Sequence, residues 1–276
     1  MDEEGENMAQ PISKIIKINE NVSFEVKIAG QGEPVVFLHN IGGLKWNRFL
    51  DQLSDHYQVY APHLPGTGAS TGLETINNLW DLILCYYDLF DELGLESAHV
   101  IGHSLGGMIA AELAATDQSR VKQLVAIAPV GLFLEDHPIP DMFAMLPEEL
   151  NRLLILDQDS PEAQMMRYVP DDLDDRTELM IERIQNQVAA AKFLWPIPDK
   201  GLKSRIHRIK AQTLLVWGKQ DGLIPVVYGE EFNRRIAHSE LKIIESASHL
   251  VDVEQTEKVI AHIQDFLKTS IVASSR

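Results

Sequence analysis

Gly102-His103-Ser104-Leu105-Gly106 is the most informative segment of this chain. It lies between an apolar run, Ala98-His99-Val100-Ile101, and a helix-like segment from Met108 to Ala115. A strand, a tight turn carrying a serine and a helix form a nucleophile elbow, in which the turn presents the hydroxyl at the end of a buried strand. The flanking glycines let the strand and the helix approach without a Cβ clash. The pattern therefore predicts that Ser104 is a nucleophile.

Two further residues are candidates to activate this serine, and each follows a predicted strand. Asp221 comes after Thr213-Leu214-Leu215-Val216-Trp217, a short apolar run typical of a buried parallel strand. His249 lies in a loop of small residues after Leu241-Lys242-Ile243-Ile244. In open α/β sheets, ligands bind at the carboxyl ends of the strands. We therefore expect the three side chains to meet at one edge of a sheet.

Strand-like and helix-like segments alternate along most of the chain. Pro34-Val35-Val36-Phe37-Leu38 is fully apolar, as expected of a central buried strand, and a long helix is predicted from Glu74 to Leu93. The alternation stops between Gly131 and about Arg208, where helix-like patterns and several prolines occur, and it resumes at Thr213. This order predicts an α/β fold, with a mostly parallel sheet flanked by helices and a helical insertion.

The composition disfavours several classes of partner. The 276 residues carry a net charge of −17, whereas nucleic-acid binding needs a basic surface and anionic lipid attracts basic segments. No apolar segment approaches the length of a membrane span, and the segment from Met1 to Gln10 lacks the apolar core of a signal peptide. We therefore expect a cytoplasmic protein that binds a small-molecule substrate, and neither nucleic acid nor membrane. The oligomeric state stays open.

The sequence contains no motif for a cofactor or a metal. Leu64-Pro65-Gly66-Thr67-Gly68-Ala69-Ser70 is rich in turn formers but is not a dinucleotide-binding fingerprint, because Thr71 stands where a third glycine is required. The chain has no H-E-x-x-H motif and only one cysteine. Cys85 lies in an apolar helical pattern, where a buried and unreactive thiol is expected. No metal or organic cofactor is expected.

With these segments in place, the chain resembles the α/β-hydrolase superfamily from about Ile12 to Leu267. The resemblance rests on Val35-Val36-Phe37-Leu38-His39, Leu64-Pro65-Gly66-Thr67-Gly68-Ala69-Ser70, Ile101-Gly102-His103-Ser104-Leu105-Gly106-Gly107, Leu215-Val216-Trp217-Gly218 with Asp221 and Pro225, and Ser248-His249. In this superfamily the catalytic residues occur along the chain in the order serine, acid, histidine. The resemblance thus implies that Ser104, Asp221 and His249 are the catalytic residues.

The resemblance also implies a division into domains. A core would comprise residues 12–131 and 209–276, and the insertion at residues 132–208 would be the helical cap of the capped members. Residues 1–11 are expected to form a disordered tail. The superfamily includes carboxylesterases, lactonases, thioesterases, carbon–carbon bond hydrolases and a few hormone receptors, so membership leaves the substrate open.

Hydrolysis through an acyl-enzyme is the chemistry that the resemblance implies. His249 would take the proton of Ser104 as the hydroxyl attacks a carbonyl carbon, and Asp221 would orient the imidazole. The backbone N–H groups of Ile41 and Leu105 would form the oxyanion hole. Water activated by His249 would then release the acyl group.

Two positions depart from the family pattern, and one leaves a choice open. His39-Asn40 stands where the family usually has His-Gly, and asparagine tolerates left-handed backbone geometry better than most residues, so the turn is expected to survive. His63 stands where an aspartate commonly precedes the glycine-containing loop. Asp136, just past the strand before the insertion, is a rival to Asp221 because some family members place the acid there.

The substrate is expected to contact the insertion. Met142, Met145, Phe193 and Trp195 are candidates to line an apolar pocket over Ser104, and methionine with aromatic rings suits an apolar acyl or aromatic substrate. The simpler alternative is that these side chains pack the core of the insertion itself. The leading hypothesis is a carboxylesterase-like serine hydrolase acting on a small, fairly apolar ester, lactone or thioester. The alternatives are a carbon–carbon bond hydrolase of the same fold and a ligand-binding receptor with a slow or inactive triad.

Overall fold

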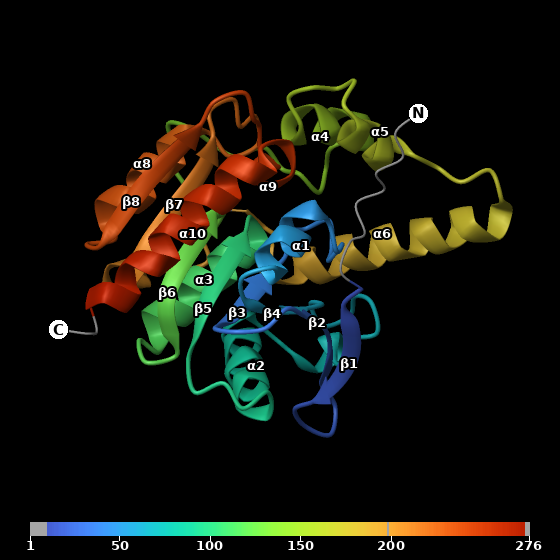
Figure 1. Cartoon of the computed structure of the whole chain (residues 1–276). Coiled ribbons are helices and arrows are strands. Elements are labelled where there is room, and N and C mark those ends of the chain that lie inside the picture. The colour runs from blue at the N-terminus through green and yellow to red at the C-terminus, as the bar shows by residue number, and fades with distance from the viewer. Residues whose placement is uncertain (1–9, 198, 274–276) are drawn as a thin grey trace, which may run out of the picture.

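The computed structural model describes residues 10–197 and 199–273, so the tail expected at residues 1–11 falls almost entirely outside it. Within these residues, an eight-stranded sheet forms the centre, in the order β1-β2-β4-β3-β5-β6-β7-β8 (Figure 1). The strands from β4 to β8 in this order pair in parallel, and β1 and β2 add antiparallel pairs at one edge. The predicted fold class is confirmed. The strands are β1 Ile12–Lys17, β2 Ser23–Ala29, β3 Pro34–Leu38, β4 Gln58–Pro62, β5 Ala98–His103, β6 Val121–Ile127, β7 Gln212–Gly218 and β8 Ser239–Ile244.

Helices cover both faces of the sheet (Figure 1). The helices that form these two layers are α1 Arg48–Ser54, α2 Leu79–Glu92, α3 Leu105–Thr116, α8 Val226–Arg235 and α10 Thr256–Ala273. Along β3, Val35 and Phe37 join a buried cluster with residues of α1 and α10, whereas Val36 and Leu38 join a larger cluster with residues of α2, α3 and α8. Each such buried side chain contributes about 1.5–3 kcal/mol to folding. Burial on both faces explains why the strand sequences are continuously apolar.

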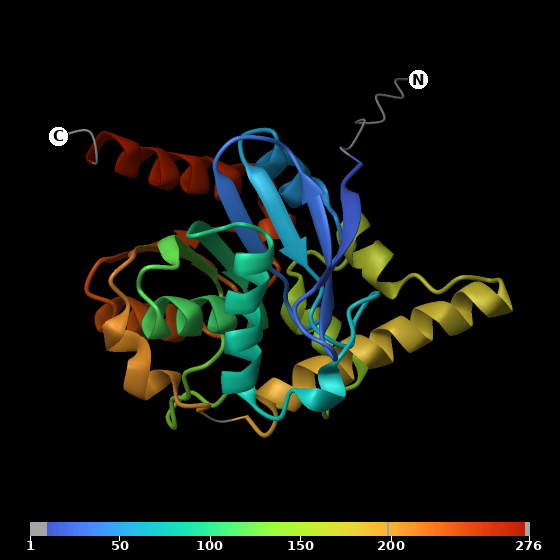
Figure 2. The ribbon, with the colours of Figure 1, turned by 90° about the horizontal axis from the view of Figure 1, so that it is seen from below.

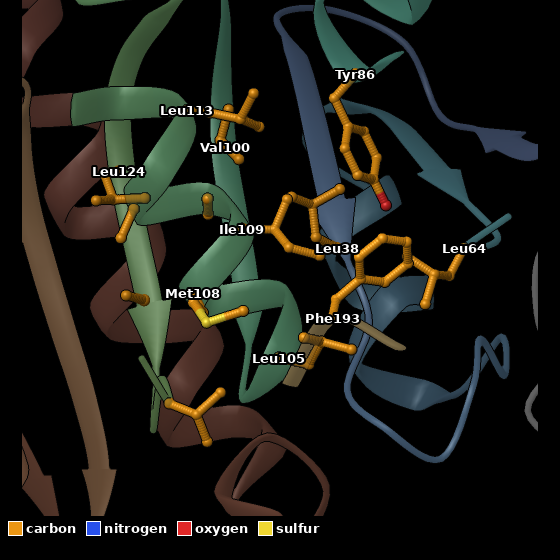
Figure 3. Close-up of a cluster of buried hydrophobic side chains, with 14 of the residues drawn as sticks. Leu38, Leu64, Tyr86, Val100, Leu105, Met108, Ile109, Leu113, Leu124 and Phe193 are labelled. Carbon is orange, nitrogen blue, oxygen red and sulfur yellow. The ribbon is translucent and has the colours of Figure 1, made fainter. Parts of the chain in front are cut away.

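Helix α3 lies inside the larger cluster. Its residues from Leu105 to Ala115 are all buried, and Met108, Ile109 and Leu113 belong to the same cluster as Val100 of β5 (Figure 3). A helix that is apolar on every side belongs in a protein interior. The turn between β5 and α3 is therefore held at both ends by packed elements.

One helix is shorter than its sequence pattern predicts. The expected helix over residues 74–93 is a 3₁₀ turn, Leu73–Thr75, followed by α2, which begins at Leu79. The Asn78 side chain accepts a hydrogen bond from the N–H of Asp81 at 3.0 Å, and such an N-cap contributes about 1 kcal/mol. The prediction was wrong here because an apolar pattern does not mark a helix start, whereas a capping side chain does.

Between β6 and β7 the chain forms helices and, in its described residues, no strand; we call residues 128–211 the helical insertion. Its elements are α4 Pro147–Leu154, α5 Pro161–Arg167, α6 Leu173–Leu194, α7 Leu202–Arg205 and a 3₁₀ turn, Ile206–Arg208. Asn186 and Phe193 in the second half of α6 are buried, while the first half extends away from the sheet (Figures 1 and 2). No helix in the described ranges is long and apolar enough to span a lipid bilayer.

An ion pair between a buried glutamate and a partly exposed arginine ties the end of the helical insertion to α3. Glu112 is 1% exposed and accepts two hydrogen bonds from the Arg205 guanidinium, at 2.8 and 2.7 Å. The hydrogen bonds to Glu112 raise the pKa of Arg205 above its ordinary value. The two-point geometry matches a planar guanidinium to a carboxylate, so this pair fixes where the chain re-enters the core before β7.

Candidate active site

Ser104 lies in the turn between β5 and α3 with a strained backbone. Its φ and ψ are 55° and −112°, a conformation that costs a non-glycine residue about 1–3 kcal/mol. Neighbouring backbone groups impose it: the Ser104 N–H donates to the Ile127 carbonyl at 2.9 Å, and the Ser104 carbonyl accepts from the Val130 N–H at 3.2 Å. The hydroxyl is therefore presented at the carboxyl end of β5.

The glycines around Ser104 are required by close backbone contacts. A Cβ at Gly102 would lie 2.2 Å from the Gly106 carbonyl oxygen, and a Cβ at Gly106 would lie 2.0 Å from the Leu38 carbonyl oxygen. Both distances are far below van der Waals contact, so no other residue fits. The Gly106 N–H also donates to the His39 carbonyl at 3.1 Å. The elbow is thus joined to the loop that follows β3.

Asp221 and His249 contact each other directly. His249 Nδ1 lies 2.9 Å from Asp221 Oδ2, and both side chains are buried. The other carboxylate oxygen, Oδ1, accepts the N–H groups of Leu223 at 2.9 Å and Ile224 at 2.8 Å. Because a carboxylate only accepts, Nδ1 carries the proton and Nε2 is left with a lone pair. This is the tautomer of a general base.

Two polar atoms of the site are buried without a partner. Ser104 Oγ and His249 Nε2 form no hydrogen bond within the residues that the structure describes. An unpaired buried polar group costs about 1–3 kcal/mol, and such exceptions call for a functional explanation. One atom is a hydroxyl that can donate a proton, and the other is a nitrogen that can accept it. Such a pair is chemically suited to serve as a nucleophile and its base.

The rival acid lies elsewhere. Asp136 is exposed on the chain that follows β6, where it lines a cavity of about 410 Å³ together with Asp199 and Lys203. The structure therefore brings Asp221, and not Asp136, to the imidazole of His249.

The two expected oxyanion donors come from different loops. Leu105 is the first residue of α3, so its N–H has no partner within the helix and lies where the helix dipole favours a negative charge. Ile41 lies in the turn after β3. In that turn the Asn40 side chain accepts the N–H of Gly42 at 2.8 Å, and the Asn40 carbonyl accepts the N–H of Gly43 at 3.3 Å. Both loops are thus fixed by backbone hydrogen bonds.

Asn40 preserves this turn by a different means from the one expected. It is absent from the described non-glycine residues with positive φ, whereas Gly43 has a φ of 88°. The turn forms as expected, but it does not use the tolerance of asparagine for left-handed geometry. Its side-chain oxygen closes a short turn onto Gly42 instead, a role for which asparagine is well suited.

His39 is held in one neutral form. Its Nδ1 donates to the Asn40 carbonyl at 2.7 Å, and its Nε2 accepts the Leu64 N–H at 3.0 Å. Burial, and to a lesser degree the nearby His63, lower the pKa of His39 to about 4. The ring therefore links two loops as a neutral bridge, and its nitrogens are both occupied.

The helical insertion contacts two of the loops that form the site. Asn186 of α6 donates to the Gly42 carbonyl at 3.0 Å, and Ser248 donates to the Leu153 carbonyl of α4 at 2.7 Å. Sequence reasoning missed Asn186, because a single asparagine in a helix carries no signal for a partner 144 positions away. These contacts place the insertion against both the expected oxyanion turn and the His249 loop.

The candidate substrate residues are placed differently from one another. Met142 is buried and Met145 partly buried, and Phe193 packs into the core cluster of Leu105 (Figure 3). Trp195 is 55% exposed, and its indole N–H donates to an Asp141 carboxylate oxygen at 3.2 Å. Phe193 thus has the packing of a core residue, while Trp195 lies at the surface.

The described residues show no metal-binding cluster and no activated cysteine. Within residues 10–197 and 199–273, no three His, Cys, Asp or Glu side chains are grouped so that they could hold a metal ion. Cys85 lines a separate cavity of about 390 Å³, and burial, followed by the nearby Asp88 and Asp81, raises the pKa of its thiol to about 11. A thiol with so high a pKa is a poor nucleophile.

Comparison with known proteins shows what the chain is similar to. A protein of Cupriavidus necator named the dihydrolipoyllysine-residue acetyltransferase component of an acetoin cleaving system is 29% identical, and the match covers 86% of this chain and 64% of that protein. The chain thus spans less than two thirds of that relative. The pimeloyl-[acyl-carrier protein] methyl ester esterase of Aeromonas salmonicida is 26% identical, over 89% of this chain and all of the relative. The 2-hydroxy-6-oxo-6-phenylhexa-2,4-dienoate hydrolase of Comamonas testosteroni is 26% identical, over 93% and 96%.

A solved structure supports the same fold. A bacterial membrane phospholipase A superposes with a TM-score of 0.79 at 22% identity, over 94% of this chain and 86% of the other. The family described as having the alpha/beta hydrolase fold matches residues 33–254, which confirms the resemblance inferred from the sequence motifs. The chain belongs to the alpha/beta hydrolase fold family.

Proposed function

We propose that this chain is a serine hydrolase that cleaves a small, fairly apolar ester, lactone or thioester through an acyl-enzyme. One observation carries the proposal. The Asp221–His249 hydrogen bond leaves the lone pair of Nε2 without a partner, and Ser104 Oγ is likewise unpaired in the described chain. A base and a nucleophile prepared in this way are what acyl transfer requires.

In the first half of the reaction, Ser104 Oγ attacks the carbonyl carbon and its proton passes to His249 Nε2. The negative charge on Asp221 stabilises the resulting imidazolium. The carbonyl oxygen becomes an oxyanion, which the N–H groups of Leu105 and Ile41 stabilise. When the tetrahedral intermediate collapses, His249 returns the proton to the departing alcohol or thiol, and the acyl group stays on Ser104.

In the second half, water replaces the leaving group. His249 Nε2 takes a proton from the water as its oxygen attacks the acyl carbon, and the same two N–H groups stabilise the second oxyanion. Collapse of this intermediate returns the proton to Ser104 Oγ and releases a carboxylic acid. The side chains are then as they began, so one set of residues serves both halves.

The choice of an ester-like bond rests on the site and on the relatives. Ser104 is fully buried, and the first residues of α3 with side chains, Leu105, Met108 and Ile109, are apolar. A small acyl group with little charge therefore suits the site better than a charged one. The Aeromonas salmonicida relative is named as a methyl ester esterase, which supports an ester as the scissile bond.

Carbon–carbon bond hydrolysis is the second candidate. The Comamonas testosteroni relative is named as a 2-hydroxy-6-oxo-6-phenylhexa-2,4-dienoate hydrolase, and the match covers 96% of it. The same three side chains would serve this reaction. A comparison of kcat/KM for p-nitrophenyl butyrate and for a 2-hydroxy-6-oxodienoate decides between the two, and a higher value for the dienoate would replace the ester by the carbon–carbon bond.

The test of the proposal compares four proteins on p-nitrophenyl acetate and butyrate. Ser104→Ala should lower kcat by about 10⁴-fold or more, because it removes the nucleophile. Asp221→Asn should lower kcat by about 10⁴-fold, because the imidazole is then held in the wrong tautomer.

Asp136→Asn is the matched control and should change kcat by less than about threefold. Retention of the wild-type rate by Ser104→Ala would refute the mechanism. A larger loss with Asp136→Asn than with Asp221→Asn would instead transfer the role of the acid.

A further inference from the structure

A second buried histidine–aspartate pair lies beside the first. The ring of His103, the residue before Ser104, is centred 5.1 Å from the ring of His249. His103 Nδ1 lies 3.3 Å from Asp252 Oδ1, and the side chains are 0% and 4% exposed. Asp252 belongs to the short helix α9, Val251–Glu254, directly after the His249 loop. The mechanism described above uses neither His103 nor Asp252.

His103 is bonded to the main chain of His249. His103 Nε2 lies 3.0 Å from the His249 carbonyl oxygen. A carbonyl oxygen can only accept, so Nε2 carries a proton and donates it. The residue next to the nucleophile thus holds the backbone of the general base. Both residues are buried, so water cannot readily replace this hydrogen bond.

The other ring nitrogen of His103, Nδ1, faces both a hydrogen-bond donor and a hydrogen-bond acceptor. Asn40 Nδ2, which can only donate, lies 3.3 Å from Nδ1, and Gly42 fixes the orientation of this amide by donating to its oxygen. Asp252 Oδ1, which accepts, also lies 3.3 Å from Nδ1. Asp252 Oδ1 forms no hydrogen bond within the described residues, so its contact with His103 is an ion pair that lacks the geometry of a hydrogen bond.

The carboxylate of Asp252 has a stronger effect on the protonation of His103 Nδ1 than the amide of Asn40. A buried charge without a partner costs more than an unmet amide donor on a partly exposed side chain, so the proton belongs on Nδ1. Burial opposes the charged ring of His103, but Asp252, the His249 carbonyl and the more distant Asp221 together raise the pKa of His103 above its ordinary value. The charged and titratable groups that face this ring are therefore Asp252, Asp221 and His249.

We propose that His103 is a positioning residue, whose Nε2–H holds the main chain of His249 while Asp252 fixes the orientation of the ring. The proposal rests on the proposed function, because its consequence is the alignment of the His249 imidazole with Ser104. His103 directly precedes Ser104 and is hydrogen-bonded to the main chain of His249, so it joins the two segments that carry the proposed nucleophile and its base. A displacement of about 1 Å at such a site lowers the rate by about 10²-fold.

Two amide substitutions separate the hydrogen bond to the His249 carbonyl from the ion pair with Asp252. The amide nitrogen of glutamine lies as far along the side chain as Nε2 of histidine, and that of asparagine as far as Nδ1. His103→Gln therefore keeps a donor toward the His249 carbonyl, and His103→Asn loses it. Both are made in Asp252→Asn protein, so that neither leaves a buried carboxylate unpaired.

The expected result is a difference in kcat alone. Asp252→Asn is the reference protein and should lower kcat by about three- to tenfold. The His103 ring then loses the group that orients it, although a neutral His103 still donates through Nε2 and accepts from Asn40 through Nδ1. Relative to Asp252→Asn, His103→Gln/Asp252→Asn should keep kcat within about threefold, whereas His103→Asn/Asp252→Asn should lose about 10²-fold in kcat with KM for p-nitrophenyl butyrate little changed. Equal kcat values for the two double variants would overturn the proposal.

A second measurement does not depend on turnover. Nitrogen NMR of histidine-labelled protein at pH 7 should show both ring nitrogens of His103 protonated in the wild type and only Nε2 protonated in Asp252→Asn. An unprotonated Nε2 in the wild type would overturn the hydrogen bond to the His249 carbonyl. An unprotonated Nδ1 would overturn the ion pair with Asp252. Both outcomes can be read even if either double variant fails to fold. If wild-type protein shows no esterase activity, the proposed function fails, and the NMR result still decides the state of His103.

Discussion

At the scale of single residues, the hydrogen bonds of the neighbouring side chains decide which atoms of the site can exchange a proton. His39 has both ring nitrogens occupied and Asp221 has both oxygens occupied. Ser104 Oγ and His249 Nε2, in contrast, are among the buried atoms that have no hydrogen-bond partner in the described part of the chain. Because His39 and Asp221 have no free acceptor, they cannot take the Ser104 proton in the proposed mechanism. His39 is thereby distinguished from His249, whose Nε2 is left free to accept a proton.

The buried, neutral state of His39 predicts a dependence of stability on pH. Its pKa is lowered from 6.5 to about 4, so between these values the unfolded chain takes up a proton that the folded chain does not. The contribution of neutral His39 to the free energy of unfolding is therefore complete above pH 6.5 and is lost as the pH falls toward 4. Between pH 7 and pH 5 the loss should be about 2 kcal/mol.

Urea unfolding at both pH values measures this loss. In His39→Gln the fall in the free energy of unfolding from pH 7 to pH 5 should be about 2 kcal/mol smaller than in wild type. An unchanged fall would show that His39 is protonated in the folded chain, contrary to its hydrogen bonds.

At the scale of elements, the apolar runs predicted the strands well and the polar contacts between elements poorly. Strands buried on both faces, such as β3 and β7, leave an unbroken apolar run that few other structures produce. The start of α2 was missed because it depends on one capping side chain, Asn78. The contacts of Asp252 and Asn186 could not be predicted, because each joins segments that only the finished fold brings together.

The contact between α6 and the turn after β3 predicts an effect of Asn186 on the rate. Asn186→Ala removes the donor to the Gly42 carbonyl, which loosens the turn that carries Ile41. Since a fully lost oxyanion donor costs about 10²–10³-fold, we expect a loss of about tenfold in kcat.

Gln187→Ala, the exposed neighbour on the same helix, is the control and should leave kcat on p-nitrophenyl butyrate unchanged. If the two variants behave alike, the helical insertion does not support the oxyanion turn.

At the scale of the whole molecule, the site is assembled by one edge of the parallel sheet. Ser104, Asp221 and His249 follow β5, β7 and β8, whose carboxyl ends face the same way. Sequence motifs were sufficient to predict this arrangement because the order of residues along the chain and the parallel sheet together determine it. They were not sufficient for the substrate, because Met142, Met145, Phe193 and Trp195 range from buried to exposed within the helical insertion.

The attachment of the helical insertion to the core predicts a large effect on stability. Arg205→Met leaves the buried carboxylate of Glu112 without its partner, which should lower the free energy of unfolding by about 3 kcal/mol. Lys219→Met breaks a pair whose side chains are 54% and 65% exposed and should change it by less than about 0.5 kcal/mol. Urea unfolding of the two variants makes the comparison, and equal effects would show that the Glu112 pair contributes no more than a surface one.

The most direct test of the active site is covalent labelling with a fluorophosphonate, read by mass spectrometry of the digested protein. We predict a single adduct on Ser104 in the folded wild type, no adduct in Ser104→Ala, and labelling slowed by about 10²-fold or more in His249→Gln, which lacks the base. Absence of an adduct at Ser104 in folded wild-type protein, or labelling of His249→Gln at the wild-type rate, would contradict the account.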